Sequence, residues 1–414
     1  MIREVTSFLQ RTRAVPGGTR DSNLGVRRRT VHVLSVAVLL CACAPPEPHH
    51  EIGEPLRGLT AEELARFRAG RALFDKVFTA AEGLGPLFNE NQCSACHTDP
   101  ASGGTGEQLV LKATRFAGPG DCDLLTEEGG ENIRRQATPA LQAHGITRES
   151  VPSSATERGR FTAPFLFGLG LVEAIPDAAI LAREDAQDTD RDGVSGRAGR
   201  TVDGRVARFS RKAELATLRD FTDSALRFEM GLTTPLNPIE PGISGRSLPP
   251  RTDPAPDPEI DEGQLDLLTD FVRFLAPPAR RWPTGEAERA LVAEGERLFA
   301  RLDCTACHVP TLRTGASAVA ALRRQRIDLY SDLLLHDMGP RLANVCGLGA
   351  TPTELRTAPL MGLGRRRVYL HDGRTTNLHE AILFHGGEAA TARDRFRALG
   401  RVRQESVIQF LRSL

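Results

Sequence analysis

Two copies of the pattern C-x-x-C-H lie more than two hundred residues apart in this chain, at residues 93–97 and 304–308. In this pattern each cysteine can form a thioether bond with a haem vinyl group, and the histidine can bind the iron as proximal ligand. Zinc is the competing interpretation, but zinc ribbons rarely separate their cysteine pairs so widely or follow both with histidine. The pattern therefore predicts two covalently bound haems c. Their attachment and ligand residues would be Cys93, Cys96, His97, Cys304, Cys307 and His308.

The second axial position of each iron decides what such a protein can do. An iron with two strong protein ligands mainly transfers electrons, whereas an open or loosely closed iron can bind peroxide or another small molecule. Beyond the two proximal histidines, the candidate ligands after residue 43 are a few methionines and the histidines His49, His50, His144, His336, His371, His379 and His385.

Two predicted helices precede the two haem-binding patterns. Thr60 and Glu63 form a capping box that begins the first helix, whose apolar side comprises Leu64, Phe67, Leu73 and Phe74. The second is expected to begin after Pro283 with Thr284 as its N-cap and with Leu291, Leu298 and Leu302 as its apolar stripe. The pattern G-x-x-L-F recurs at residues 70–74 and 295–299, which favours a duplicated haem-binding unit.

The fold expected from these elements is mainly α-helical, with two cytochrome c-like haem domains, long loops and little β structure. Pro-rich stretches separate the two units, and the domain boundary is placed in the last of them because residues 260–275 still look helical. The N-terminal haem domain would span residues 59–282 with insertions, and the C-terminal haem domain residues 283–414. The best strand candidate is the apolar run 168–176.

The first 43 residues have the features of a signal peptide. Three arginines precede a short apolar run that ends in Leu-Cys-Ala-Cys, which resembles a bacterial lipobox with Cys43 as the lipid-carrying residue. A plain signal peptide cleaved near Ala44 is the alternative. Residues 44–58 are polar and Pro-containing, as in a tether. We therefore expect a protein of the periplasm or outer cell envelope that meets the membrane only through a lipid anchor.

Composition agrees with an exported globular protein. The chain is 40% hydrophobic and 26% charged, with 53 basic and 53 acidic residues. Removing the signal segment takes away seven Arg and only two acidic residues, which leaves a net charge of about −5. Nucleic acid is not an expected partner, because phosphate binding requires a basic excess. The two remaining cysteines, Cys122 and Cys346, could pair in an oxidising compartment or stay as buried thiols.

The segment "RTAPLMGLGRRRVYLHDGRTTNLHEAILFHGGEA" (356–389) resembles the C-terminal haem segment of the bacterial di-haem cytochrome c peroxidase superfamily. The nearer resemblance is to its di-haem oxidoreductase branch, described as peroxidases or thiol oxidoreductases. The matching stretches "GLGPLFNENQCSACH", "PFLFGLGLVEAIPDAAIL", "DTDRDGVSGR" and "LHDMGP" extend it from about residue 56 to the C-terminus.

The resemblance implies roles for further residues. In the superfamily a ligand of the C-terminal haem follows the motif histidine, here His371, by fourteen residues, and that position is His385. It therefore implies a bis-histidine site, with His371 hydrogen-bonding near the haem. The usual distal histidine position of the N-terminal haem is Ala113, which leaves that site open or closed by His144, His336 or Met338.

A peroxide pocket in this superfamily uses an acid to move protons during O–O cleavage. Glu173 in "GLVEAIP" and Glu229 in "RFEMG" are the candidates, and Glu173 is preferred. The run Asp188, Asp190, Asp192, Gly193 supplies alternating oxygen ligands before a glycine, which predicts a Ca²⁺ site or a solvated turn.

The resulting hypothesis is an exported di-haem c-type cytochrome oxidoreductase. It would pass electrons from a redox partner protein between two haems, and would reduce peroxide or oxidise a small-molecule substrate. A non-catalytic di-haem electron carrier is the alternative, and an enzyme that matures a partner protein is a third. A high-spin iron signal would separate the catalytic hypothesis from the carrier.

Overall fold

The structure is a computed structural model that describes residues 51–414. The predicted signal segment, with Cys43, and the first part of the tether lie outside the described residues. Contacts group residues 51–414 into one compact unit. None of its helices between residues 51 and 414 combines the length and the apolar character that spanning a bilayer requires.

Helices outweigh strands, at 33% and 15% of the residues. The predominance of helix agrees with the sequence, while the division into two cytochrome c-like domains stays a prediction. The α-helices are α1 (Ala61–Phe74), α2 (Cys93–Cys96), α3 (Pro139–Gln142), α4 (Leu169–Glu173), α5 (Asp177–Leu181), α6 (Leu218–Ala225), α7 (Glu262–Phe274), α8 (Glu286–Arg301), α9 (Leu378–Phe384), α10 (Ala390–Ala398) and α11 (Arg401–Ser413). A π-helical turn, η3 (Leu226–Met230), continues α6.

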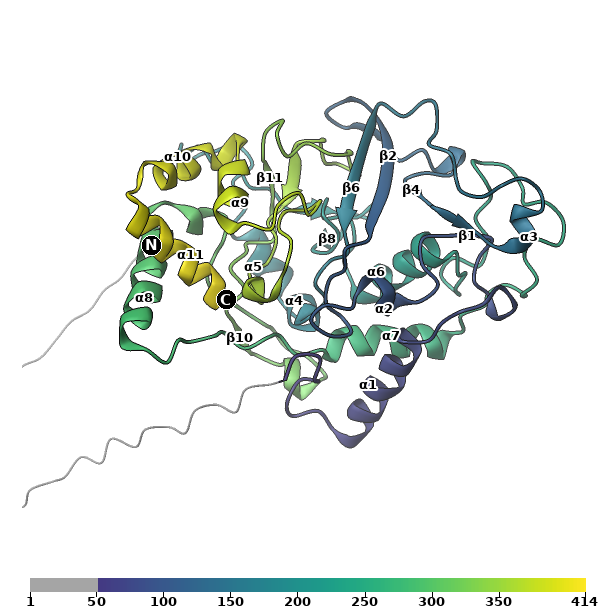
Figure 1. The fold of residues 1–414 in the computed structure, drawn as a ribbon, viewed down its shortest axis with the longest axis horizontal. Helices are drawn as coiled ribbons and strands as arrows, with labels where there is room; N and C mark the ends of the chain where they lie inside the picture. Colours follow the sequence, from purple (N-terminus) through teal and green to yellow (C-terminus); the bar gives the residue numbers. More distant parts are fainter. Residues whose placement is uncertain (1–50) are drawn as a thin grey trace, which may run out of the picture. The chain divides into compact units, whose positions relative to one another are not determined.

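Two long helix pairs form the frame on which the haem-binding patterns are carried. Helix α1 packs on α7, and α8 packs on α11 (Figure 1). The capping box of Thr60 and Glu63 is present at the start of α1, as predicted. The predicted N-cap of α8 is wrong by one residue, because Gly285 and not Thr284 occupies it. The prediction that Leu291 belongs to the apolar stripe facing the core is also wrong. Leu291 is 36% exposed, and Val292 is buried in its place.

The strands are short except in one antiparallel sheet. They are β1 (Leu87–Phe88), β2 (Leu109–Gly118), β3 (Asp121–Asp123), β4 (Asn132–Ile133), β5 (Gln136–Ala137), β6 (Glu157–Thr162), β7 (Gly199–Arg200), β8 (Val206–Ala207), β9 (Leu312–Arg313), β10 (Arg326–Ile327), β11 (Leu335–Asp337) and β12 (Glu354–Arg356). Strand β2 pairs with β3, β4 and β6, and Figure 1 shows β2 and β6 as the longest strands.

The run 168–176, predicted as the best strand candidate, is not a strand. Its first part forms helix α4 after a left-handed Gly168. Leu169, Leu171 and Val172 are all buried, so the run is apolar because it is surrounded by core on all sides. A short apolar run without periodicity does not distinguish a buried helix from a buried strand.

The buried apolar side chains form two main clusters. The larger cluster includes Phe67 and Phe271 from the N-terminal half together with Leu334 and Met361 from the C-terminal half. The smaller cluster lies entirely within residues 292–414, between α8, α11 and the segments around them. Cys122 and Cys346 form a disulfide that links β3 to the loop after β11. The sequence had left open whether these two cysteines pair or stay as buried thiols. The core and this bond therefore both join residues on either side of the predicted domain boundary.

Candidate haem-binding sites

The two C-x-x-C-H segments are supported by equivalent helix pairs. Gly70 in α1 lies against α7, where an added Cβ would come within 2.0 Å of the Leu267 carbonyl oxygen. Gly295 in α8 lies against α11, where an added Cβ would come within 1.9 Å of the Ser406 carbonyl oxygen. The pattern G-x-x-L-F thus occurs twice in the chain, and in both copies its glycine makes a close contact between two helices. This supports the predicted duplication at the level of packing.

The phenylalanine at the end of each G-x-x-L-F contacts the histidine of its own C-x-x-C-H. The ring centroids of Phe74 and His97 are 5.9 Å apart, and those of Phe299 and His308 are 6.1 Å apart. Phe74 precedes Cys93 by nineteen residues and Phe299 precedes Cys304 by only five, yet each phenylalanine lies at a similar distance from its imidazole.

Both motif histidines are oriented by the same kind of hydrogen bond. Nδ1 of His97 lies 2.9 Å from the Gly104 carbonyl oxygen, and Nδ1 of His308 lies 2.9 Å from the Tyr330 carbonyl oxygen. Donation from Nδ1 fixes the tautomer and leaves the Nε2 lone pair available to a metal. Burial lowers the pKa of His97, and it lowers that of His308 to about 4. Both imidazoles are therefore neutral at pH 7, as an iron ligand must be.

None of the four motif cysteines takes part in a disulfide. Burial raises the pKa of Cys93, Cys96 and Cys304 to about 12, so that these thiols are protonated at neutral pH. Among residues 51–414, no cluster of three or more metal-ligating side chains unites the two C-x-x-C-H segments. The geometry thus gives no support to a zinc site made from four cysteines.

A cavity of about 690 Å³ opens beside the first motif and is bordered by Cys93, Cys96 and His97. Its volume falls within the range of about 300–1,000 Å³ that is usual for cofactor and ligand pockets. Most of its remaining wall is apolar. The wall includes residues from β2, from the segment after β6, from residues 201–225, from η3 and from residues 356–366. A largely apolar cavity with a neutral imidazole and two thiols at one end fits a covalently attached haem.

The structure separates the two candidate acids. Glu173 does not border the cavity: its carboxylate accepts hydrogen bonds from the backbone N–H of Leu218 and from Nε of Arg273, both at 2.8 Å. These bonds anchor the start of α6 and the end of α7, so the preference for Glu173 as the catalytic acid is not supported by its position. Glu229 in η3 does border the cavity.

The environment of Glu229 suits an acid that holds a proton. Burial raises the pKa of Glu229, although hydrogen bonds from Nδ2 of Asn89 at 2.7 Å and Nδ2 of Asn132 at 2.6 Å act in the opposite direction. The two amides also fix the orientation of the carboxyl group. π-Helical turns are rare and recur at functional sites because they change the direction in which a few side chains point. The sequence named Glu229, but it could not show that a π-helical turn places it at the cavity.

None of the three side chains named for the second position of the first iron borders this cavity. His144 is exposed, and His336 lies beside the second motif, with Nδ1 3.6 Å from Sγ of Cys307. Met230 and Met361 are the methionines at the cavity wall, and Sδ of Met230 lies 3.8 Å from Sγ of Cys93. No spacing rule in the sequence distinguished these two methionines.

At the second motif, His385 lies close enough to His308 for its charge to contribute to lowering the pKa of His308, after burial. Nδ1 of His385 is 2.9 Å from the Ala381 carbonyl oxygen, one turn back in α9. His308 makes the same kind of hydrogen bond, so His308 and His385 would both offer Nε2 to a haem iron. The ligand role of His385 stays a prediction.

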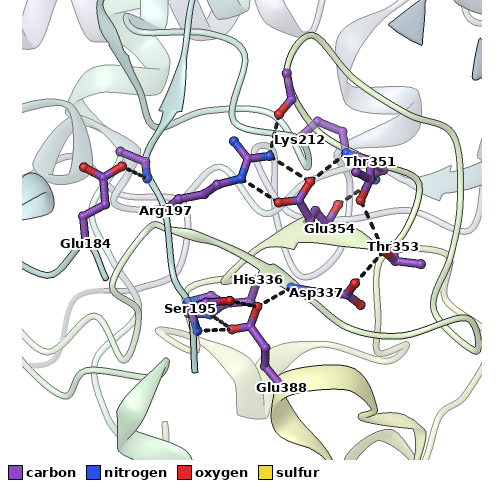
Figure 2. Close-up of polar contacts among 12 residues, drawn as sticks. Glu184, Ser195, Arg197, Lys212, His336, Asp337, Thr351, Thr353, Glu354 and Glu388 are labelled. Carbon is purple, nitrogen blue, oxygen red and sulfur yellow. Dashed lines mark hydrogen bonds and ion pairs between the residues drawn. The ribbon is translucent and has the colours of Figure 1, made fainter. Parts of the chain in front are cut away.

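A buried charged network holds the segment after His385 in place. Figure 2 shows the carboxylate of Glu388 between Ser195, His336 and Asp337, all of which donate hydrogen bonds to it at 2.7–3.0 Å. The other ring nitrogen of His336, Nε2, is 2.8 Å from Asp332. Despite burial, these carboxylates raise the pKa of His336 to about 12, with Asp332 the largest of the raising causes. With both ring nitrogens engaged, His336 acts as a structural cation and not as an iron ligand.

The remaining predicted positions are placed as follows. His371 is buried, and its Nε2 has no hydrogen-bond partner within residues 51–414 but lies 4.0 Å from a carboxylate oxygen of Asp372, so its role near a haem stays a prediction. The carboxylates of Asp188 and Asp190 converge with that of Asp185, in place of Asp192. The carboxylates of Asp185 and Asp188 also accept hydrogen bonds from backbone N–H groups of the same exposed loop. A Ca²⁺ site there therefore stays a prediction.

The sequence pattern of a protein family described as "Di-haem oxidoreductase, putative peroxidase" matches residues 154–414 of this chain. The match covers more than half of the chain and includes the second C-x-x-C-H, the H-D-G motif and His385. No protein of curated function matches the chain.

Several solved structures are similar in outline. Hydrazine synthase of Kuenenia stuttgartiensis is 11% identical, with 94% of this chain and 100% of that chain covered and a TM-score of 0.41. The diheme peroxidase BthA from Burkholderia thailandensis E264 is 14% identical, with 90% and 93% covered and a TM-score of 0.40. A MauG-like protein associated with microbial copper homeostasis is 16% identical, with 90% and 95% covered and a TM-score of 0.36. At these scores the likeness is one of outline only.

Proposed function

The chain belongs to the di-haem oxidoreductase family, and from this membership we propose that it is an exported di-haem c-type oxidoreductase with peroxidase-like activity. One haem would be attached at Cys93 and Cys96 with His97 as ligand. The other would be attached at Cys304 and Cys307 with His308 and His385 as ligands. The proposal includes export to the periplasm or outer envelope, with a lipid at Cys43 and a redox partner protein as the electron source.

The observation that carries the catalytic part of the proposal is a half-buried acid and a neutral imidazole that border one apolar cavity. Glu229 and His97 both border it, and none of the histidines His144, His336 and His385 does. A bound haem would supply the iron and relay electrons from the redox partner. The protein's contribution is to orient the ligand through Gly104, to exclude bulk water with apolar walls, and to keep an ionisable group beside the reacting atoms.

Glu229 would supply protons to the substrate oxygen. Reduction of one hydrogen peroxide to two waters consumes two protons and two electrons, so a proton source beside the cleaved O–O bond lowers the barrier. Because burial raises the pKa of Glu229, its carboxyl group carries a proton over a wider pH range than an ordinary glutamate does and can donate it there. Asn89 and Asn132 would hold the carboxyl group in a fixed orientation throughout the transfer.

The test compares the two glutamates in the purified holoprotein. Glu229→Gln keeps the shape and the hydrogen-bonding oxygen but cannot deliver a proton, and we expect peroxide turnover per haem to fall about 100-fold or more. Glu173→Gln is the matched control, since it removes a buried carboxylate outside the cavity. It should lower stability and leave turnover per haem unchanged. Loss of turnover only in Glu173→Gln would show that the acid is assigned wrongly.

Spectroscopy separates this proposal from a pure electron carrier. A high-spin iron signal that peroxide changes is expected from the haem at His97. Two low-spin irons whose spectra peroxide does not change in any redox state would instead favour a non-catalytic di-haem cytochrome.

A further inference from the structure

Three arginines border the same cavity as His97 and have no acidic partner there. They are Arg211, Arg356 and Arg366. None of the three takes part in an ion pair among residues 51–414, where most other buried or half-buried arginines do. Their hydrogen bonds go to neutral oxygens: Arg356 Nε donates to the Ser210 carbonyl at 2.9 Å, and Arg211 and Arg366 reach Thr162 and Pro359 only at 3.4 Å.

Arg366 is the least satisfied of the three. Its Nε is buried and has no hydrogen-bond partner within the described part of the chain. Its guanidinium lies 4.9 Å from the ring centroid of Phe165, which gives it an aromatic surface but no negative charge. A buried polar group without a partner costs free energy, and a buried charge costs more. Such a group is retained where a ligand completes its contacts.

Electrostatics shows that the three guanidiniums form one positively charged wall. The pKa of Arg366 is lowered to about 9. Burial is the main cause, and the positive charges of Arg211 and Arg356 contribute to the same lowering. Burial lowers the pKa of Arg211 and Arg356 to about 10. All three are still protonated at pH 7. The carboxylates that raise the pKa of Arg211 and Arg356 are those of Asp372 and Asp332, and these are already paired with Arg374 and His336.

We propose that Arg211, Arg356 and Arg366 form a carboxylate-binding site inside the cavity, and that its ligands are the two propionates of the haem attached at Cys93 and Cys96. This inference rests on the proposed function, because it requires a haem at the first motif. Thioether bonds form at the vinyl groups of a haem, and its propionates leave from a different edge of the ring. The wall that receives the propionates must therefore be formed by residues other than those of the C-x-x-C-H segment.

The chemistry of the wall fits carboxylates. A guanidinium presents a planar fork of N–H donors that matches the two oxygens of a carboxylate and stays charged at all working pH values. Two carboxylates would reduce the excess of positive charge and give Arg366 Nε an acceptor. A free carboxylate substrate offers the same chemistry, so the experiment must distinguish the two sources.

The experiment measures the midpoint potentials of the two haems in the holoprotein between pH 6 and pH 8. In Arg366→Gln and, separately, Arg211→Gln, we expect an unchanged amount of covalent haem and a lower potential at one haem only. Loss of a nearby positive charge destabilises the reduced state, which carries one positive charge fewer. The lowered potential should also become pH-dependent, since a propionate without its arginine takes up a proton on reduction. Arg366→Lys should restore most of the potential because it keeps the charge.

Arg367→Gln is the matched control. This neighbouring arginine points outward, with its side chain 75% exposed and paired to Asp99, so its charge is screened by water. It should change neither potential. Equal potentials and equal pH dependence in wild type, Arg366→Gln and Arg211→Gln would overturn the proposal.

Three further outcomes are distinguishable. Acetate or benzoate that perturbs the spectrum of the wild-type holoprotein, with an affinity lost in Arg366→Gln, would assign the site to a free carboxylate and overturn the propionate assignment. A correctly exported wild-type protein without covalent haem at Cys93 and Cys96 would overturn the proposed function and this inference with it. Altered potentials in the arginine variants of a di-haem protein that has no peroxide turnover would support this inference alone.

Discussion

Three histidines in this protein are oriented by the same contact, in which Nδ1 meets a backbone carbonyl oxygen. His97, His308 and His385 share this contact, at 2.9 Å in each case. His336 differs, because both of its nitrogens meet carboxylates. A single hydrogen-bonding detail thus separates the candidate iron ligands, which are neutral, from a structural histidine, which is a cation.

The role of His385 can be tested by substitution. In His385→Ala we expect both haems to stay covalently attached, while one low-spin iron becomes high-spin because it loses its second ligand. His385→Met should keep that iron low-spin and raise its potential, since a thioether stabilises the reduced state better than an imidazole does. Absorption and EPR spectra of the oxidised protein provide the measurement. His379→Ala, in the same helix α9 but bonded to Gln404, is the control and should leave both spectra unchanged.

The pKa of His336 makes a prediction about pH. Its folded-state pKa, raised to about 12, lies far above the value of about 6.5 expected in an unfolded chain. The charged network therefore contributes its full stability below about pH 6.5 and loses it progressively as the pH rises towards 12. The free energy of unfolding of His336→Gln should be lower than that of wild type by about 3–5 kcal/mol at pH 6. The difference should shrink by pH 9, and a constant difference from pH 6 to pH 9 would contradict this account.

At the scale of elements, the protein uses one packing unit twice. A helix with glycine in the middle and phenylalanine at its end packs on a second helix through Gly70 and α7, or through Gly295 and α11. Phe74 lies 4.8 Å from Phe271, and Phe299 lies 5.3 Å from Phe410, measured between ring centroids. Each unit thus places an aromatic pair behind the imidazole that is to bind iron, which restricts how the imidazole can turn.

This unit predicts the effect of a single methyl group. In Gly295→Ala the new Cβ would lie 1.9 Å from the Ser406 carbonyl oxygen, so α8 and α11 must separate. We expect a loss of about 1–3 kcal/mol in the free energy of unfolding, measured by chemical denaturation. Gly263→Ala in α7 is the control, because its nearest neighbour is a side-chain oxygen at 3.3 Å. Alanine there should be neutral or stabilise by up to about 1 kcal/mol. Equal losses in the two variants would argue against the close contact.

At the scale of the whole molecule, the first cavity is built from both halves of the chain. Its wall includes α2, β2 and η3 from the N-terminal half and residues 356–366 from the C-terminal half. The larger hydrophobic cluster crosses the predicted boundary in the same way. The disulfide between Cys122 and Cys346 closes a separation of 224 residues and ties the two halves beside the sheet.

The disulfide should therefore matter for global stability. Cross-linking across so long a loop restricts the unfolded chain, and its removal is expected to cost about 2–5 kcal/mol. The double variant Cys122→Ser/Cys346→Ser should unfold at a lower temperature than wild type under oxidising conditions. A reductant should lower the wild-type value to that of the variant and leave the variant itself unchanged. A reductant that lowers both values equally would show that it acts elsewhere.

The sequence by itself determined the features whose chemistry is local. Cysteines and histidine adjoin in C-x-x-C-H, the capping box spans three residues, and G-x-x-L-F repeats within one helix, so each is visible in a short window. The family match and the agreement of α1 and α7 with the predicted helices follow from such windows. The start of α8 was misplaced by one residue because Thr and Gly are both good N-caps.

Which residues share the cavity depends on how distant segments of the chain pack together. Glu173 and Glu229 look alike in the sequence, and only the π-helical turn brings Glu229 to the wall while Arg273 engages Glu173. The partners of Arg366, the pairing of Cys122 with Cys346 and the helical state of residues 169–173 likewise depend on segments distant in the chain. Burial and pairing are properties of neighbours in space, and no pattern confined to a few consecutive residues specifies which neighbours those are.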